Sequence, residues 1–132
     1  MSGNYYDCGT VFKLTPGAKG YTEEILWNFG AQGDGAAPAA GLYADAKGAL
    51  YGVTVAGGLR ACKGGCGTAF KLTRAGKHYK EPILWKFGAH LDCVNPVSTL
   101  IADEDGDLYG TTELGGTNRA HATIAGVAPC SS

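Results

Sequence analysis

Cys62 and Cys66, separated by three residues, are the pair most suggestive of site chemistry in this sequence of 132 residues. Two thiolates at this spacing could be half of a metal site, but structural zinc needs about four ligands. No second Cys or His pair has a suitable spacing. The alternatives are a local disulfide, expected if the protein is secreted, or two thiols. We predict a disulfide between Cys62 and Cys66, no bound metal and no cofactor.

A cluster of acidic residues, Asp103–Asp107, resembles the opening of a calcium-binding loop. A complete loop also needs a later bidentate glutamate at a fixed offset, and Glu113 lies too close to the turn. The sequence therefore favours a solvated Asp-Gly hairpin turn. The segment His90–Cys93 brings three polar residue types together, but no acid–base pair accompanies it. We predict no catalytic residues and no enzyme.

Four aromatic residues recur at matching places in the two halves of the chain: Trp27 with Trp85, and Tyr51 with Tyr109. Aromatic side chains either pack between sheets or form a platform on which sugars stack. Repetition is expected under both interpretations, so both stay open. These four are the candidate binding residues, and carbohydrate is the candidate ligand.

The aromatic pairs belong to a repeat with a period of 58 residues. About half of the aligned positions are identical, and a period of this size indicates stacked supersecondary units. Positions 58 residues apart are called equivalent below. The matching segments are Cys8–Thr15 with Cys66–Thr73, Ile25–Trp27 with Ile83–Trp85, Phe29–Ala31 with Phe87–Ala89, Leu50–Gly52 with Leu108–Gly110, and Gly57–Gly58 with Gly115–Gly116.

Each repeat predicts four short antiparallel strands. Thr10, Phe12 and Leu14 alternate with residues of the other face, which is the period-two pattern of a half-buried strand. Four-stranded units of about 40–50 residues are typical of β-propeller blades. We predict an all-β fold with β-propeller blades of four antiparallel strands, two blades per chain. The predicted strands are Gly9–Thr15, Tyr21–Phe29, Ala40–Ala44, Ala49–Val55, Gly67–Thr73, Tyr79–Phe87, Thr99–Ala102 and Asp107–Thr112.

These motifs resemble the GloVer (Gloeobacter–Verrucomicrobia) tandem repeat, whose pattern runs from G-T-V-F-K-L-T-P through D-G-x-x-P to G-L-x-x-D-x-x-G-x-L-Y-G-T-T and G-G. The resemblance covers about Gly9 to Gly116, with a departure at Cys93. It implies a bacterial, extracellular or surface-associated repeat protein without catalytic residues, kelch-like by analogy. The residues that carry it in the first copy are Gly9–Pro16, Asp34, Gly35, Pro38, Gly41, Leu42, Asp45, Gly48 and Leu50–Gly52.

The chain begins in the middle of a unit. Residues 1–8 lead in, 9–29 form the C-terminal half of a blade, 30–87 a complete blade with its connecting loop, and 88–116 the N-terminal half of a blade. An isolated chain would expose sheet faces and edges. We expect strand exchange between subunits that join head to tail, closing a six- or eight-bladed ring as a homotrimer or homotetramer. Residues 117–132 fit a frame-shifted continuation and are predicted to be disordered.

The net charge of −1 and the scattered basic residues argue against a nucleic-acid partner, and the apolar runs are too short to span a membrane. The chain opens without a signal-peptide pattern, although five cysteines and the resemblance favour an extracellular location. The compartment therefore stays open. We predict a non-enzymatic repeat module, a binding or structural protein, with carbohydrate or another surface polymer as ligand. The alternatives are a hydrolase or lyase on a propeller scaffold, and a fragment of a longer array without separate activity.

Overall fold

A computed structural model of the chain describes residues 8–30, 34–59, 64–88 and 95–115. Within these ranges every regular element is a β-strand, which confirms the all-β prediction. The strands pair antiparallel in several sheets, and none of the described sheets closes on itself. The strands are β1 (Thr10–Gly17), β2 (Gly20–Asn28), β3 (Gly35–Ala36), β4 (Tyr43–Ala44), β5 (Leu50–Thr54), β6 (Ala56–Gly57), β7 (Thr68–Ala75), β8 (His78–Lys80), β9 (Ile83–Lys86), β10 (Ile101–Ala102) and β11 (Leu108–Tyr109).

The largest sheet, called the central sheet, contains β4, β5, β7, β8 and β9. Strand β5 lies between β4 and β7, and both β8 and β9 pair with β7. The sequence predicts a single strand over Tyr79–Phe87, but Pro82 divides it into β8 and β9, because proline has no N–H to donate to the ladder. The equivalent residue is Glu24, and β2 runs through it without a break.

The N-terminal hairpin, β1–β2, has the register that joins β7 to β9. Val11 is paired with Trp27 as Ala69 is paired with Trp85, and the register shifts by a bulge after each of these pairs. The N-terminal hairpin therefore has the structure of one half of the central sheet.

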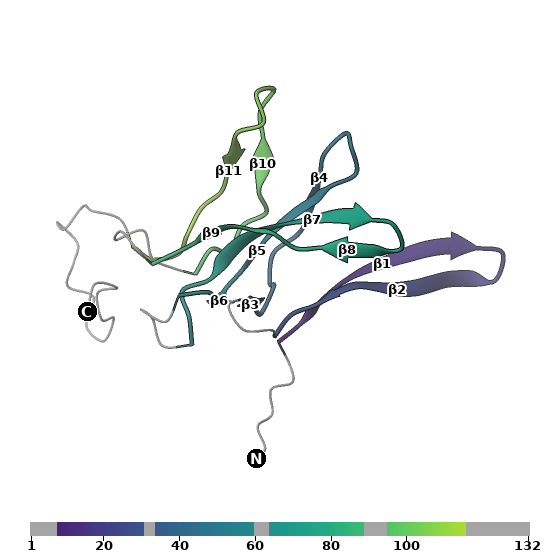
Figure 1. Ribbon diagram of the computed structural model, residues 1–132, viewed down its shortest axis with the longest axis horizontal. Helices are drawn as coiled ribbons and strands as arrows, with labels where there is room; N and C mark the ends of the chain where they lie inside the picture. Colours follow the sequence, from purple (N-terminus) through teal and green to yellow (C-terminus); the bar gives the residue numbers. More distant parts are fainter. Residues whose placement is uncertain (1–7, 31–33, 60–63, 89–94, 116–132) are drawn as a thin grey trace, which may run out of the picture.

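The C-terminal hairpin, β10–β11, has the structure of the other half. Ile101 is paired with Tyr109 as Tyr43 is paired with Tyr51 in β4–β5. Figure 1 draws the central sheet between the two hairpins. The chain thus contains one complete sheet and, at its two ends, the separate halves of another.

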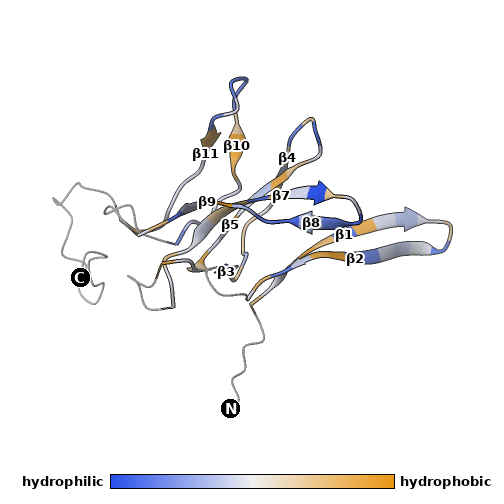
Figure 2. Ribbon diagram, in the orientation of Figure 1, coloured by the Kyte–Doolittle hydropathy of each residue, from blue (hydrophilic) through white to orange (hydrophobic). Residues whose placement is uncertain are grey.

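Hydrophobic clusters lie on both faces of the central sheet. Because neighbouring side chains of a strand point to opposite faces, Phe70 and Leu72 enter the cluster toward the N-terminal hairpin, while Ala69 enters the cluster toward the C-terminal hairpin. Figure 2 shows apolar residues along β1, β2 and β10, and hydrophilic residues at the tip between β10 and β11. The first cluster contains Val11, Leu26, Phe29, Phe70 and Leu72, and the second contains Val53, Ala69 and Leu100.

The loops repeat as closely as the strands do. Ala37 and Asn95, which are equivalent, hold φ values of 58° and 59°, a left-handed conformation that is uncommon outside glycine. Their carbonyl groups accept equivalent hydrogen bonds, from the Val55 and Glu113 N–H groups, both at 3.0 Å. The first of these loops also contains β3, which pairs with β6 and was predicted as loop.

Candidate functional site

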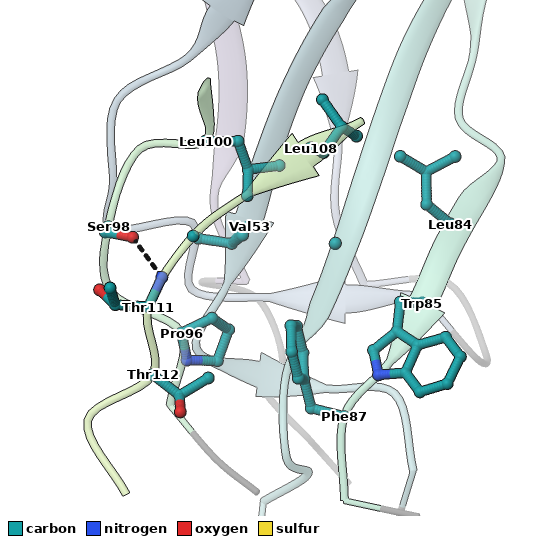
Figure 3. A pocket seen from close by; sticks show the side chains of 12 residues that line it. Val53, Leu84, Trp85, Phe87, Pro96, Ser98, Leu100, Leu108, Thr111 and Thr112 are labelled. Atoms are coloured by element: carbon teal, nitrogen blue, oxygen red, sulfur yellow. Dashed lines mark hydrogen bonds between the residues drawn. The ribbon is translucent and has the colours of Figure 1, made fainter. Parts of the chain in front are cut away.

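An apolar groove lies between the central sheet and the C-terminal hairpin (Figure 3). It has a volume of about 280 Å³. Leu100 and Leu108 line it from the hairpin, and Val53 lines it from the central sheet. At its edge, Ser98 Oγ accepts a hydrogen bond from the Thr111 N–H at 2.9 Å. The other lining residues are Ala69, Leu84, Trp85, Phe87, Pro96, Gly110 and Thr112.

On the opposite face of the central sheet, the equivalent space is filled. Phe70 and Leu72 of β7 occupy it, and both side chains are completely buried. The ring of Phe70 meets that of Phe29 edge to face, with the centroids 5.2 Å apart. Phe29 is equivalent to Phe87, which lines the groove. The groove is therefore the same packing site without its two central side chains.

Strand β1 carries the same two apolar residues, and there they lie at the surface. Phe12 and Leu14 are 53% and 51% exposed, whereas the equivalent Phe70 and Leu72 are each 0% exposed. The neighbouring strands account for the difference. One edge of β7 is covered by β5, but among the described residues β1 pairs with β2 alone.

A glycine shows how closely the neighbouring strand fits. A Cβ added to Gly52 would lie 2.6 Å from Cζ of Phe70, which is closer than real contacts allow. The equivalent Gly110 lines the groove, and a Cβ there would meet only the Leu100 side chain at 2.8 Å and the Ser98 hydroxyl at 3.6 Å. The groove therefore includes the place that an aromatic ring takes over Gly52.

The acidic segment that resembles a calcium loop is a hairpin turn, as the sequence favours. Asp45 Oδ1 accepts the N–H groups of Lys47 and Ala49 at 2.9 Å, and Oδ2 accepts the Tyr51 hydroxyl at 3.1 Å. The same three hydrogen bonds recur at Asp103, where the hydroxyl of Tyr109 donates at 2.7 Å.

These hydrogen bonds stabilise the charged form of both aspartates. Donation from the Ala49 N–H is the main cause of a lowered pKa at Asp45. At Asp103 the main cause is the Tyr109 hydroxyl, and the same contact raises the pKa of Tyr109. Tyr51 and Tyr109 therefore hold turns, a role that the sequence analysis missed. The signal that could have found it is the Asp-to-Tyr spacing of six residues in both copies.

The structure places the four predicted aromatic residues in different surroundings. Trp27 packs against the first hydrophobic cluster, and its indole N–H donates to Asp34 Oδ2 at 3.3 Å. Tyr51 packs against the second cluster, on the other face of the central sheet. Trp85 and Tyr109 are 49% and 50% exposed, and Trp85 lines the groove. The four side chains are not brought together on one surface.

A pair of carboxyl groups, Asp34 and Glu81, was not foreseen from the sequence. Asp34 is buried, and its Oδ1 accepts the Gly35 N–H at 2.7 Å. Burial, and then the neighbouring Asp34 carboxyl, raise the pKa of Glu81 to about 8. Among the described residues, Glu81 Oε1 is buried without a hydrogen-bond partner. The fold joins these two residues across 47 positions, so no local pattern indicates the pair.

Cys66 is completely buried and takes part in a disulfide bond. Its predicted partner, Cys62, lies outside the described residues, as do the lead-in before Cys8 and the tail at 117–132. Within the described ranges, no three His, Cys, Asp or Glu side chains are grouped so that they could hold a metal ion. That part of the chain also has no helix of the length and apolar character needed to cross a membrane.

Comparison with known proteins tests the resemblance. No curated protein and no solved structure matches the chain. The sequence model of the Gloeobacter/Verrucomicrobia repeat matches residues 1–129, which is nearly the whole chain. The resemblance inferred from the repeated motifs is thereby confirmed, and the chain belongs to the Gloeobacter/Verrucomicrobia repeat family.

Proposed function

We propose that the chain is a non-enzymatic structural module, in which copies join head to tail and so complete propeller-like blades. One observation carries the proposal. The chain holds a complete arrangement of β4, β5, β7 and β9, and its two end hairpins have the registers of the two halves of that arrangement. Joined between two copies, the hairpins would form a second sheet of the same kind. A protein with complementary ends of this type is suited to act as a building block.

The number of copies follows from the number of blades. Each chain would contribute two blades, one complete and one assembled from halves of two subunits. Propellers contain about four to eight blades, so a ring of three or four copies is expected. A head-to-tail contact is heterologous, and it gives a closed ring only when the rotation between neighbours closes.

The mass of the protein in solution tests this proposal. Light scattering over a range of concentrations should give three or four times the 13.6 kDa of one chain. A ring also predicts that the mass stops rising at one value, because no free end remains. A mass of one chain at every concentration contradicts the proposal, and a mass that rises without limit contradicts ring closure.

A surface polymer such as carbohydrate is a second candidate, as a ligand of the module. The half-exposed rings of Trp85 and Tyr109 favour it, since exposed aromatic faces can stack on sugars. A glycan array with the wild-type chain and with Trp85→Ala and Tyr109→Ala variants tests this function. Binding that both variants lose supports it, and binding that survives in both excludes these two rings as the site.

A further inference from the structure

We propose that the groove beside the C-terminal hairpin is the docking site for β1 of a second copy of this chain, whose Phe12 and Leu14 fill it. The inference rests on the proposed head-to-tail assembly and specifies its contact residue by residue. The incoming β1 would pair with the exposed edge of β11 and extend the C-terminal hairpin, in the way that β7 extends β4–β5.

The pairing of β5 with β7 supplies the register. Within the chain, Gly52 is paired with Phe70 and Leu50 with Leu72. Moving this register by 58 residues on both strands places Gly110 opposite Phe12 of the second copy. The other predicted pairs, with the residue of the second copy named last, are Leu108 with Leu14, Tyr109 with Lys13, Thr111 with Val11, and Thr112 with Thr10.

The apolar walls of the groove fit the incoming side chains. The ring of Phe12 would rest over Gly110 and meet Phe87 edge to face, as Phe70 meets Phe29 at 5.2 Å. The surroundings of the filled site give the expected change in burial. Leu26, which packs in the filled site, is 8% exposed, whereas its equivalent Leu84 at the groove is 40% exposed. The second copy would therefore cover apolar surface that a single chain leaves in water.

A cation completes the contact on the other face of the joined strands. In the central sheet, Nζ of Lys71 lies 5.5 Å from the centre of the Tyr51 ring. Lys13 of the second copy would reach Tyr109 in the same way. A cation over an aromatic face contributes about 0.5–1 kcal/mol at an exposed site. Charge as well as shape therefore matches between β1 and β11.

The hydroxyl groups at the end of the contact are also in place. Thr54 Oγ1 and Thr68 Oγ1 lie 2.8 Å apart in the buried pairing, and the Thr54 hydroxyl donates to the carbonyl two residues later. The hydroxyl of Thr112 already makes the equivalent bond at 3.1 Å. Its oxygen is therefore oriented to receive Thr10 of the second copy.

The identity of the occupant follows from the residues that the groove requires. At the positions equivalent to Phe70 and Lys71, this chain itself continues with Ala128 and Pro129. Alanine supplies no ring, and proline supplies neither the cation nor an N–H for the ladder. Strand β1 carries the required phenylalanine, lysine and leucine, and it has an exposed edge that natural sheets otherwise protect.

Two substitutions block the contact from opposite sides. Gly110→Leu places a side chain where the ring of Phe12 would rest, and in the single chain its Cβ comes closest to the flexible end of Leu100. Phe12→Asp replaces an exposed ring with a charge that an apolar groove cannot solvate. Gly17→Leu and Thr15→Asp are the matched controls, because both positions lie on β1 beyond the segment that pairs.

Sedimentation velocity at a concentration where the wild-type chain is assembled gives the readout, and circular dichroism checks that each variant folds. We expect Gly110→Leu and Phe12→Asp each to sediment as single chains, while both controls keep the wild-type mass. An equal mixture of the two blocked variants should give a complex of two chains. One variant still offers β1 in this mixture, and the other still offers the groove.

The outcomes separate the docking site from the assembly itself. If the wild-type chain assembles but both blocked variants keep its mass, or if their mixture forms no complex, the docking site is wrong and the assembly uses another surface. If the wild-type chain stays single at every concentration, both the docking site and the proposed function are wrong.

Discussion

Phe12 and Phe70 are the same residue at equivalent positions, and truncating each to alanine separates the effect of a neighbouring strand from that of the side chain. Phe70→Ala removes a completely buried ring and its contact with Phe29, so it should cost about 3–5 kcal/mol. Phe12 is 53% exposed in the single chain, so Phe12→Ala should cost only about 1 kcal/mol there. Its exposed half, about 100 Å², would contribute about 2.5 kcal/mol more once a second copy covers it.

Urea unfolding over a wide range of protein concentrations measures both effects. Association stabilises the folded state by mass action, so the wild-type midpoint should rise with concentration. Phe70→Ala should lower the midpoint at every concentration. Phe12→Ala should lower it slightly at low concentration and should remove most of its rise. A wild-type midpoint that is independent of concentration, with the same small loss for Phe12→Ala throughout, would refute the reasoning.

Three further changes test other parts of the fold. Burial and a neighbouring carboxyl raise the pKa of Glu81 from 4.5 to about 8, so the folded state keeps a proton that the unfolded state releases, and stability should fall as pH rises between these values. Glu81→Gln should flatten this slope and stabilise by about 1–2 kcal/mol at pH 8, allowing for solvent screening of a half-buried group; an unchanged slope in thermal unfolding contradicts this. Ala37→Asn should stabilise by about 0.5–1 kcal/mol, because the left-handed conformation at Ala37 is the one that Asn95 holds; a lowered urea midpoint contradicts this. Tyr51→Phe should destabilise by about 1 kcal/mol, because it removes the 3.1 Å hydrogen bond to Asp45; a urea midpoint equal to that of the wild-type chain contradicts this.

Repetition made the strands readable from the sequence. The alternation in Thr10–Leu14 and in its copy indicates strands, and both copies form them in the same register. The boundaries were less predictable, because they depend on single residues. Pro82 divides one strand that Glu24 leaves continuous in the first copy. The short pairing of β3 with β6 was missed, since two-residue strands have no periodicity to detect.

The candidate site could be predicted only in part, for a physical reason. Phe12 and Phe70 have nearly the same local sequence, so no pattern within one strand indicates that one is exposed and the other buried. The difference arises from the strand beside each, which is a tertiary property. Gly110 belongs to a motif that the repeat identifies, but its role depends on the ring that covers Gly52. The Asp34–Glu81 contact likewise exists only once the fold joins distant segments.

Hydrogen exchange along β1 tests most directly whether its outer edge is covered in solution. In the assembled protein, the amides of residues 10–14 that point away from β2 should exchange as slowly as those of residues 68–72, which β5 protects. Dilution should release the protection of residues 10–14 while leaving that of residues 68–72. Rapid exchange at residues 10–14 at every concentration, beside a protected β7, would contradict the head-to-tail contact.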